Sequence, residues 1–179
     1  MNVCSTIGSV TVALRTLIHR AVSSGVEVTN LSPRLAADFG KSEVLCARIN
    51  LVLIQISPDA SSRNVAPELP DTVKARNRVL QSLELQYLIT AYSEPSLSAL
   101  WSVERLLESA ECTLNSNPVL TEEMLNLALP TDAGDRRAGQ ARVVPDVLTL
   151  EECCGLFRSL LTELRPSLVY RVFLRRRDP

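Results

Sequence analysis

Few side chains in this 179-residue sequence have the types and the spacing that catalysis requires. The only histidine, His19, lies among apolar residues inside a predicted helix, which favours a structural or surface role over acid–base chemistry. Two pairs of carboxylates, Glu122-Glu123 and Glu151-Glu152, stand at predicted helix starts, where acidic side chains stabilise the positive end of the helix dipole. We therefore predict helix capping for these pairs, no catalytic residue and no enzyme activity.

The cysteines are odd in number and scattered, and they lack the CxxC spacing of a metal site; they are Cys4, Cys46, Cys112, Cys153 and Cys154. The N-terminus lacks the basic, apolar and cleavage-site order of a signal peptide, so a secreted disulfide framework is not indicated. We expect the cysteines to be small buried apolar residues in a protein kept in the cytoplasm. A thiol enzyme using Cys153 or Cys154 is an alternative, but it would lack an identifiable base.

Composition and motifs argue against several classes of binding protein. The chain carries 19 basic and 20 acidic residues, a net charge of -1, which disfavours a generally basic nucleic-acid binder. No apolar run approaches the roughly 18 residues that a membrane span needs. The six glycines never form GxGxxG, GxxxxGKS/T or GxSxG, so we predict no cofactor, no metal site and no membrane partner. Almost all basic residues are arginines, a bias that suits protein interfaces.

Hydrophobic periodicity predicts a mixture of helices and strands. The three main helices are expected at 5–22, 96–116 and 150–164. The strands are expected at 44–56, 83–93, 141–148 and 168–175, with a short β-type stretch at 26–29. We therefore predict an α/β (α+β) fold, with a single mixed, mainly antiparallel sheet of about four strands covered by three main helices. One domain is expected over 1–179, with its core at about 5–175 and a short basic C-terminal end at 175–179.

Two polar residues lie near the start of the largely apolar strand expected at 44–56. Arg48 and Asn50 share one face near its start, and we expect them where that face reaches solvent or a partner. Both faces of the strand are largely apolar from there to Ile56, so its second half is expected to be covered on both sides.

Prolines mark two places where regular structure is expected to stop or bend. Pro58, Pro67 and Pro70 punctuate the connection at 57–82, which is long enough to serve partner contacts. Pro145 marks the strand at 141–148 as an edge or a bend, because proline has no N–H for a ladder.

Several segments, in this order and spacing, resemble the tail-terminator (cap) protein family of extracellular contractile injection systems of the antifeeding-prophage and Photorhabdus virulence-cassette type. The resemblance covers about residues 5–175. Its most telling pieces are LELQYLITAY at 83–92, SNPVL at 116–120 and LTLEECCGLFRSLLTELRPSLVYRV at 148–172. Some members of the family extend beyond this domain.

This resemblance implies a structural subunit rather than an enzyme. It implies a homo-oligomeric ring, six-fold in the family, that sits on the distal end of the inner tube protein and touches the last ring of the sheath protein. Assembly is expected in the cytoplasm of the producing bacterium, as a component of a contractile particle that can be released. The contact residues that we expect are Arg48, Asn50, Arg63, Asn64, Arg171, Arg175 and Arg176, the last three on a strand that can expose an edge.

Two alternatives stay open besides the thiol enzyme. A generic scaffold or adaptor subunit fits the same composition. The run of arginines between Arg171 and Arg177 suggests an arginine-tail nucleic-acid-binding protein. A charge run of this kind is usually a solvated tail, and it lacks an aromatic stacking surface beyond Tyr170 and Phe173, so nucleic acid is not the partner that we expect.

Overall fold

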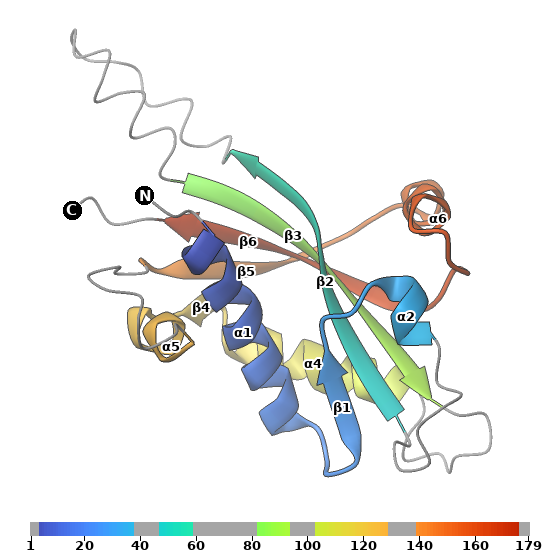
Figure 1. Ribbon diagram of the computed structural model, residues 1–179, viewed down its shortest axis with the longest axis horizontal. Helices are drawn as coiled ribbons and strands as arrows, with labels where there is room; N and C mark the ends of the chain where they lie inside the picture. The colour runs from blue at the N-terminus through green and yellow to red at the C-terminus, as the bar shows by residue number, and fades with distance from the viewer. Residues whose placement is uncertain (1–3, 38–46, 59–81, 94–102, 129–138, 176–179) are drawn as a thin grey trace, which may run out of the picture.

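A computed structural model of the chain describes residues 4–37, 47–58, 82–93, 103–128 and 139–175 (Figure 1). In chain order its elements are α1 (Cys4–Ala21), β1 (Val26–Thr29), α2 (Pro33–Ala37), β2 (Ala47–Pro58), β3 (Ser82–Ser93), α4 (Val103–Ser116), β4 (Val119–Leu120), α5 (Glu122–Leu127), β5 (Ala141–Asp146), α6 (Leu150–Ser159) and β6 (Ser167–Arg175). The three longest helices, α1, α4 and α6, correspond to the three main helices that the sequence predicts.

The strands form one sheet of six, in the order β1-β2-β3-β6-β5-β4. β1 and β2 pair in parallel and the other described pairs are antiparallel, which confirms the mixed, mainly antiparallel α+β class. The sheet is larger than the expected sheet of about four strands because it also includes β1, at the short β-type stretch expected at 26–29, and β4, which has two residues. A strand of two residues offers too few alternating positions for periodicity to reveal it.

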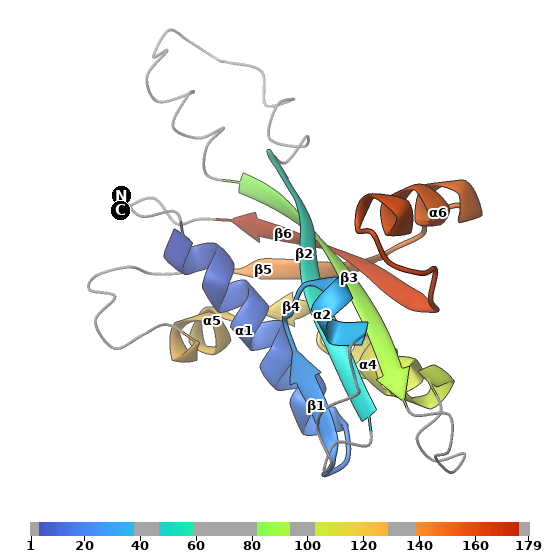
Figure 2. The ribbon, with the colours of Figure 1, turned by 45° about the vertical axis from the view of Figure 1, so that its right-hand side comes forward.

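One face of the sheet, called the inner face below, packs against α1, α4 and α5 and holds the main hydrophobic core (Figure 2). Period-two alternation puts Leu85 and Tyr87 of β3 on this face, as the sequence predicts. Leu14 and Ile18 of α1 belong to the same buried cluster. The Tyr87 hydroxyl forms a 2.8 Å hydrogen bond with the Thr11 hydroxyl of α1, so the polar atom of this core residue has a partner.

The opposite, outer face of the sheet is covered only in part. α6 packs on its middle through Phe157, which forms a small cluster with Leu88 of β3 and Val169 of β6. α2 lies over the start of β2, where Arg48 reaches the carbonyl oxygen of Ala36. Toward the first residues of β3, no helix in the described part of the chain covers the outer face (Figure 2).

A β-bulge interrupts the pairing of β2 with β3. The register shifts between Leu53 and Gln55, so Ile54 is an extra residue on β2. The extra residue reverses the alternation, and Ile56 comes opposite Leu85 with 52% of its surface exposed. The prediction that the second half of this strand is covered on both sides is therefore wrong.

Side-chain caps begin two of the helices. The Thr149 hydroxyl accepts a hydrogen bond from the backbone N–H of Glu152, and the Glu152 carboxylate accepts one from the backbone N–H of Thr149 at 2.8 Å. This is a capping box, and it lowers the pKa of the Glu152 carboxyl through the hydrogen bond from Thr149. Thr121 caps α5 in the same way through the N–H of Met124. Both acidic pairs lie in the first turns of their helices, as predicted, and Glu152 takes part in the cap itself. At α5 the cap comes from Thr121.

α6 ends earlier than the predicted residue 164. The N–H of Thr162 donates to the carbonyl oxygen of Phe157 at 3.2 Å, and the N–H of Leu161 donates to that of Arg158 at 3.1 Å. These two bonds are a Schellman motif, which requires a left-handed residue after the helix. Leu161 takes that position with φ 53°, although glycine is the residue that adopts it without strain.

Among the described strands, the sheet ends at β1 on one side and at β4 on the other, and β4 pairs only with Ala141 and Arg142 of β5. β6 is paired with β3 on one side and with β5 on the other, so the expectation that the last strand exposes an edge is wrong. On the outside of β5, the N–H of Val143 donates to the carbonyl oxygen of Pro118 at 2.8 Å. Pro145 comes two residues later on the same side and has no N–H to offer, which confirms its predicted place at an edge.

Candidate functional site

The pairing register brings charged and aromatic residues of three strands together on the open part of the outer face. Alternation along β6 puts Arg171 and Phe173 on this face, away from the buried Val172. Opposite Phe173 lie Glu84 of β3 on one side and Arg142 of β5 on the other. We call this group the open-face cluster; its members are Glu84, Gln86, Arg142, Asp146, Arg171 and Phe173.

Arg171 links three strands. Its Nη1 atom lies 3.5 Å from Oε1 of Glu84, and its Nη2 atom lies 3.2 Å from Oδ1 of Asp146. The side-chain amide of Gln86 donates to the other oxygen of Asp146 at 2.9 Å. The Arg171 side chain is 41% exposed, whereas those of Glu84 and Asp146 are 21% and 15% exposed. The carboxylates therefore lie beneath and the guanidinium lies at the surface.

Phe173 holds two arginines against its ring. The Arg142 guanidinium carbon lies 5.1 Å from the ring centroid, and that of Arg171 lies 6.0 Å from it. Each contact is a cation–π attraction worth on the order of 0.5–1 kcal/mol at an exposed site. Stacking restricts the rotamers of Arg142, which is an exposed residue, so its planar set of donors is held ready for a partner. A guanidinium presented in this way fits a carboxylate.

Arg48 lies inside the molecule rather than at its surface. It is 9% exposed, its Nη2 atom lies 2.8 Å from Oε2 of Glu27, and its Nη1 atom donates to the carbonyl oxygen of Ala36 at 3.1 Å. These contacts fasten β1 and α2 to β2.

Asn50 is also internal, with 1% of its surface exposed. Its side-chain oxygen accepts hydrogen bonds from the Thr29 hydroxyl at 2.8 Å and from the Leu31 N–H at 2.9 Å, and its amide nitrogen donates to the Leu31 carbonyl at 3.0 Å. The expectation that Arg48 and Asn50 lie where this face reaches solvent is therefore wrong. Both residues satisfy buried polar groups next to β2.

The other predicted contact residues are placed only in part. Arg63, Asn64 and Arg176 lie outside the described residues, as does the connection from 59 to 81. The backbone of Arg175 pairs with Ser82 at the end of β6. Of the predicted set, Arg171 is the residue that the structure places at the centre of an open surface.

The sequence predictions missed most of the open-face cluster. Arg142 and Asp146 stand four residues apart on β5, and Arg171 and Phe173 stand two apart on β6, so alternation alone puts each pair on one face of its strand. The sequence does not give the register between β3, β5 and β6, and that register is what joins these pairs to Glu84.

Burial raises the pKa of all three tyrosines, Tyr87, Tyr92 and Tyr170, and none of them has a chemical role. Burial raises the pKa of Tyr87 to about 12, against the hydrogen bond with Thr11, which lowers it. Burial also raises the pKa of Tyr170 to about 12, with a smaller contribution from Glu111. The Tyr170 hydroxyl donates to the side-chain oxygen of Asn115 at 3.1 Å. Both hydroxyls stay protonated and act as hydrogen-bond partners.

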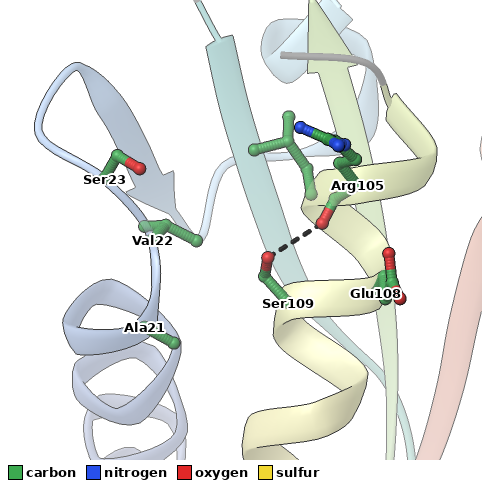
Figure 3. Close-up of a pocket in the computed structure, with 7 residues that line it drawn as sticks. Ala21, Val22, Ser23, Arg105, Glu108 and Ser109 are labelled. Atoms are coloured by element: carbon green, nitrogen blue, oxygen red, sulfur yellow. Dashed lines mark hydrogen bonds between the residues drawn. The ribbon is translucent and has the colours of Figure 1, made fainter. Parts of the chain in front are cut away.

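A shallow groove of about 350 Å³ lies between the end of α1 and α4 (Figure 3). Arg105, Glu108 and Ser109 of α4 give it its polar side chains. The Ser109 hydroxyl donates to the carbonyl oxygen of Arg105 at 2.9 Å, so it is bound to its own helix and is not paired with a base. Across residues 4–37, 47–58, 82–93, 103–128 and 139–175, no three histidine, cysteine, aspartate or glutamate side chains are grouped to hold a metal ion.

The three cysteines whose side chains the structure describes are not buried, contrary to the expectation from sequence. Cys112 and Cys154 are exposed, and Cys153 is half-buried. All three are free thiols. Among the helices that the structure describes, none is long and apolar enough to cross a membrane.

Comparison with known proteins identifies one family over nearly the whole chain. The family described as the Pvc16 N-terminal domain matches residues 9–178. No curated protein matches the chain.

Two solved cryo-EM structures have a similar fold. The first is the sheath/tube terminator, in the extended state, of a PVC extracellular contractile injection system; it is 18% identical with a TM-score of 0.60, over 100% of this chain and 58% of that chain. The second is the tube-terminating cap of the anti-feeding prophage; it is 19% identical with a TM-score of 0.59, over 95% of this chain and 55% of that chain. The chain thus spans somewhat more than half the length of each. At these identities the likeness establishes a shared fold.

Proposed function

The chain belongs to the Pvc16 N-terminal domain family, and on this premise we propose that it is a structural terminator subunit of a phage-tail-like contractile injection particle. In this role it forms a ring on the distal end of the inner tube and contacts the last sheath ring. It ends polymerisation and holds tube and sheath together, and it catalyses no reaction. Assembly takes place inside the producing cell.

The observation that carries this proposal is the agreement of family and fold over the same residues. The family match covers 9–178, and the fold matches two proteins that are themselves described as terminators of a tube or of a tube and sheath. Two solved terminators with this fold support a terminator role for a third chain with the same fold. Because the chain spans 58% and 55% of those proteins, its contacts with tube and sheath are part of the proposal.

The physical basis of capping is a difference between two faces of a ring. A tube of stacked identical rings presents the same adhesive face at its growing end after each addition. A ring with one complementary face and one inert face occupies that end without recreating it. Closing such a ring requires a head-to-tail contact between copies whose rotation closes on itself.

The surface of this chain is consistent with a role in contacts rather than chemistry. The open-face cluster presents arginines at an uncovered part of the sheet. Arg171 is the predicted contact residue that this surface includes, and Arg63, Asn64, Arg175 and Arg176 stay predicted contacts. Arg48 and Asn50 support the fold from inside.

Deletion of this chain in the producing cell tests the proposal. Electron microscopy of particles from deleted cells is expected to show tubes of irregular or excessive length, or sheaths that detach from their tubes. Restoring the chain on a plasmid is expected to restore particles of uniform length, which controls for effects on neighbouring genes. Particles of normal length and intact sheath in the deleted strain would overturn the proposed role.

A further inference from the structure

Arg142 is a cation that the rest of the described chain leaves available. It is exposed and stacks on Phe173 with its guanidinium carbon 5.1 Å from the ring centroid. Arg171, on the same ring, already has Glu84 and Asp146 as partners. Val119, which pairs with Arg142 across β4 and β5, is 36% exposed and extends the same surface with apolar area. An arginine fixed on an aromatic ring beside apolar side chains is typical of residues that anchor protein interfaces.

A complementary surface exists elsewhere on the same chain. α4 carries three exposed carboxylates, Glu104, Glu108 and Glu111, at spacings of four and three residues. This spacing puts them in one row along the helix. We call this row the α4 acidic stripe. Arg105 stands one residue after Glu104 and three before Glu108, so it borders the stripe, and it lines the groove between α1 and α4 together with Glu108.

The two surfaces lie on different sides of the molecule, so they cannot meet within one copy. α4 packs against the inner face through Leu106 and Ala110, whereas the open-face cluster lies on the outer face. Glu108, the centre of the acidic stripe, stands two residues from both Leu106 and Ala110, so it points about 160° away from each around the helix axis. The stripe therefore faces away from the core, where a neighbouring copy can reach it.

We infer that the open-face cluster of one copy, centred on Arg142, docks on the α4 acidic stripe, centred on Glu108, of the next copy in a head-to-tail ring. The occupant of each surface is a second copy of this chain. This inference rests on the proposed function for the existence of a ring, and it assigns the two surfaces that close the ring. Paired charges at such a contact also fix the register between neighbours.

Charge reversal tests the inference on the full chain, with mass in solution as the readout. Arg142→Glu places a carboxylate against the stripe, and Glu108→Arg places an arginine against the cluster, so each variant alone is expected to weaken association about tenfold or more. The double variant restores opposite charges and is expected to recover association. An equimolar mixture of the two single variants is also expected to associate, because each unlike neighbour pair then carries opposite charges.

Controls separate this contact from general effects of charge and folding. Arg34→Glu and Glu163→Arg make the same charge changes at exposed positions on α2 and after α6, and they are expected to leave association unchanged. Circular dichroism checks that every variant folds.

Association of the single variants at wild-type strength would overturn the inference and leave the capping proposal standing. A wild-type chain that stays monomeric at all concentrations would overturn the inference as well, while the deletion experiment decides capping on its own readout.

Discussion

Asn50 makes three hydrogen bonds from a position that is 1% exposed, and together they hold the segment after β1 against β2. Replacing it with alanine removes the partner of the Thr29 hydroxyl and of both Leu31 backbone groups. Buried polar groups left unpaired are costly, so we expect Asn50→Ala to lower the free energy of unfolding by about 2–4 kcal/mol. Urea denaturation followed by circular dichroism measures this change.

The neighbouring Asn30 provides a matched control, because it is exposed on the same segment. Asn30→Ala is expected to change the unfolding free energy by no more than about 0.5 kcal/mol. Equal losses for the two alanine variants would show that the internal role assigned to Asn50 is wrong.

Tyr87 makes the free energy of unfolding depend on pH in the alkaline range. Its pKa is raised by burial from 10.0 to about 12, so between these pH values the unfolded chain loses a proton that the folded chain keeps. The stabilising contribution is therefore complete below pH 10 and is lost as pH rises toward 12, by up to about 2.7 kcal/mol. Urea midpoints measured from pH 9 to 11.5 are expected to fall in this window.

The variant Tyr87→Phe isolates this contribution. At neutral pH its free energy of unfolding is expected to be about 1 kcal/mol lower, because the hydrogen bond to Thr11 is lost. In the alkaline range its free energy of unfolding is expected to fall less steeply with pH. The slope is reduced rather than abolished because Tyr170 titrates in the same window. An unchanged slope in the variant would contradict the assignment to Tyr87.

At the scale of elements, the end of α6 carries local strain. Leu161 holds φ at 53° to complete the Schellman motif, and its side chain is 76% exposed. A left-handed backbone conformation costs a residue other than glycine roughly 1–2 kcal/mol. Glycine avoids this cost, but its greater freedom in the unfolded chain lowers stability by roughly 0.5–1 kcal/mol. We therefore expect Leu161→Gly to stabilise the chain by about 0.5–1 kcal/mol in thermal or urea unfolding.

Leu164 serves as the control for this substitution. It is 51% exposed and follows the turn without a positive φ. Leu164→Gly is expected to be neutral or destabilising, because it gains no relief of backbone strain. A loss of stability in Leu161→Gly equal to that in Leu164→Gly would rule out strain at the helix end.

The elements that were predictable from sequence are the long ones with a strong period. The strand at 83–93 alternates over its whole length, and the capping box at Thr149 fixes the start of α6, so both appear where expected. α2 has five residues and β4 has two, which is too short for any period to be visible. The bulge at Ile54 and the end of α6 at a leucine depend on tertiary packing, and no local residue type signals either one.

For a related reason, only one residue of the candidate site could be predicted from the sequence. Arg171 stands out in the sequence as an arginine within an apolar strand. Its partners Glu84 and Asp146 come from strands that are distant along the chain, and only the pairing register brings them together. In the same way, Arg48 and Asn50 looked like surface residues because the sequence does not reveal that β1 and α2 return to cover them.

At the scale of the whole molecule, the described surface carries opposite charges on two sides, which favours contact between copies of the chain. The net charge of -1 conceals arginines on the outer face of the sheet and a row of carboxylates on α4. Exposed ion pairs are screened by salt, so ring association is expected to weaken as ionic strength rises from about 0.05 M to 0.5 M. Sedimentation velocity across this range measures the effect, and association that strengthens with salt would indicate an apolar contact instead.

The sheet edge at Pro145 also affects how whole molecules can assemble. An unpaired strand edge invites uncontrolled addition of further chains, and a terminator must not recreate a growing surface. Removing the N–H at the free side of β5 limits such addition there. This feature agrees with a subunit whose assembly stops at a closed ring.

Cryo-EM of particles purified from the producing cell, through an affinity tag on the chain, tests whether this chain closes the end of a contractile particle. We expect density for the fold described above as one closed ring at the distal end of each tube, in contact with the last sheath ring. Particles whose tube ends lack this fold, or in which it repeats along the tube, would show that the chain is not a terminator.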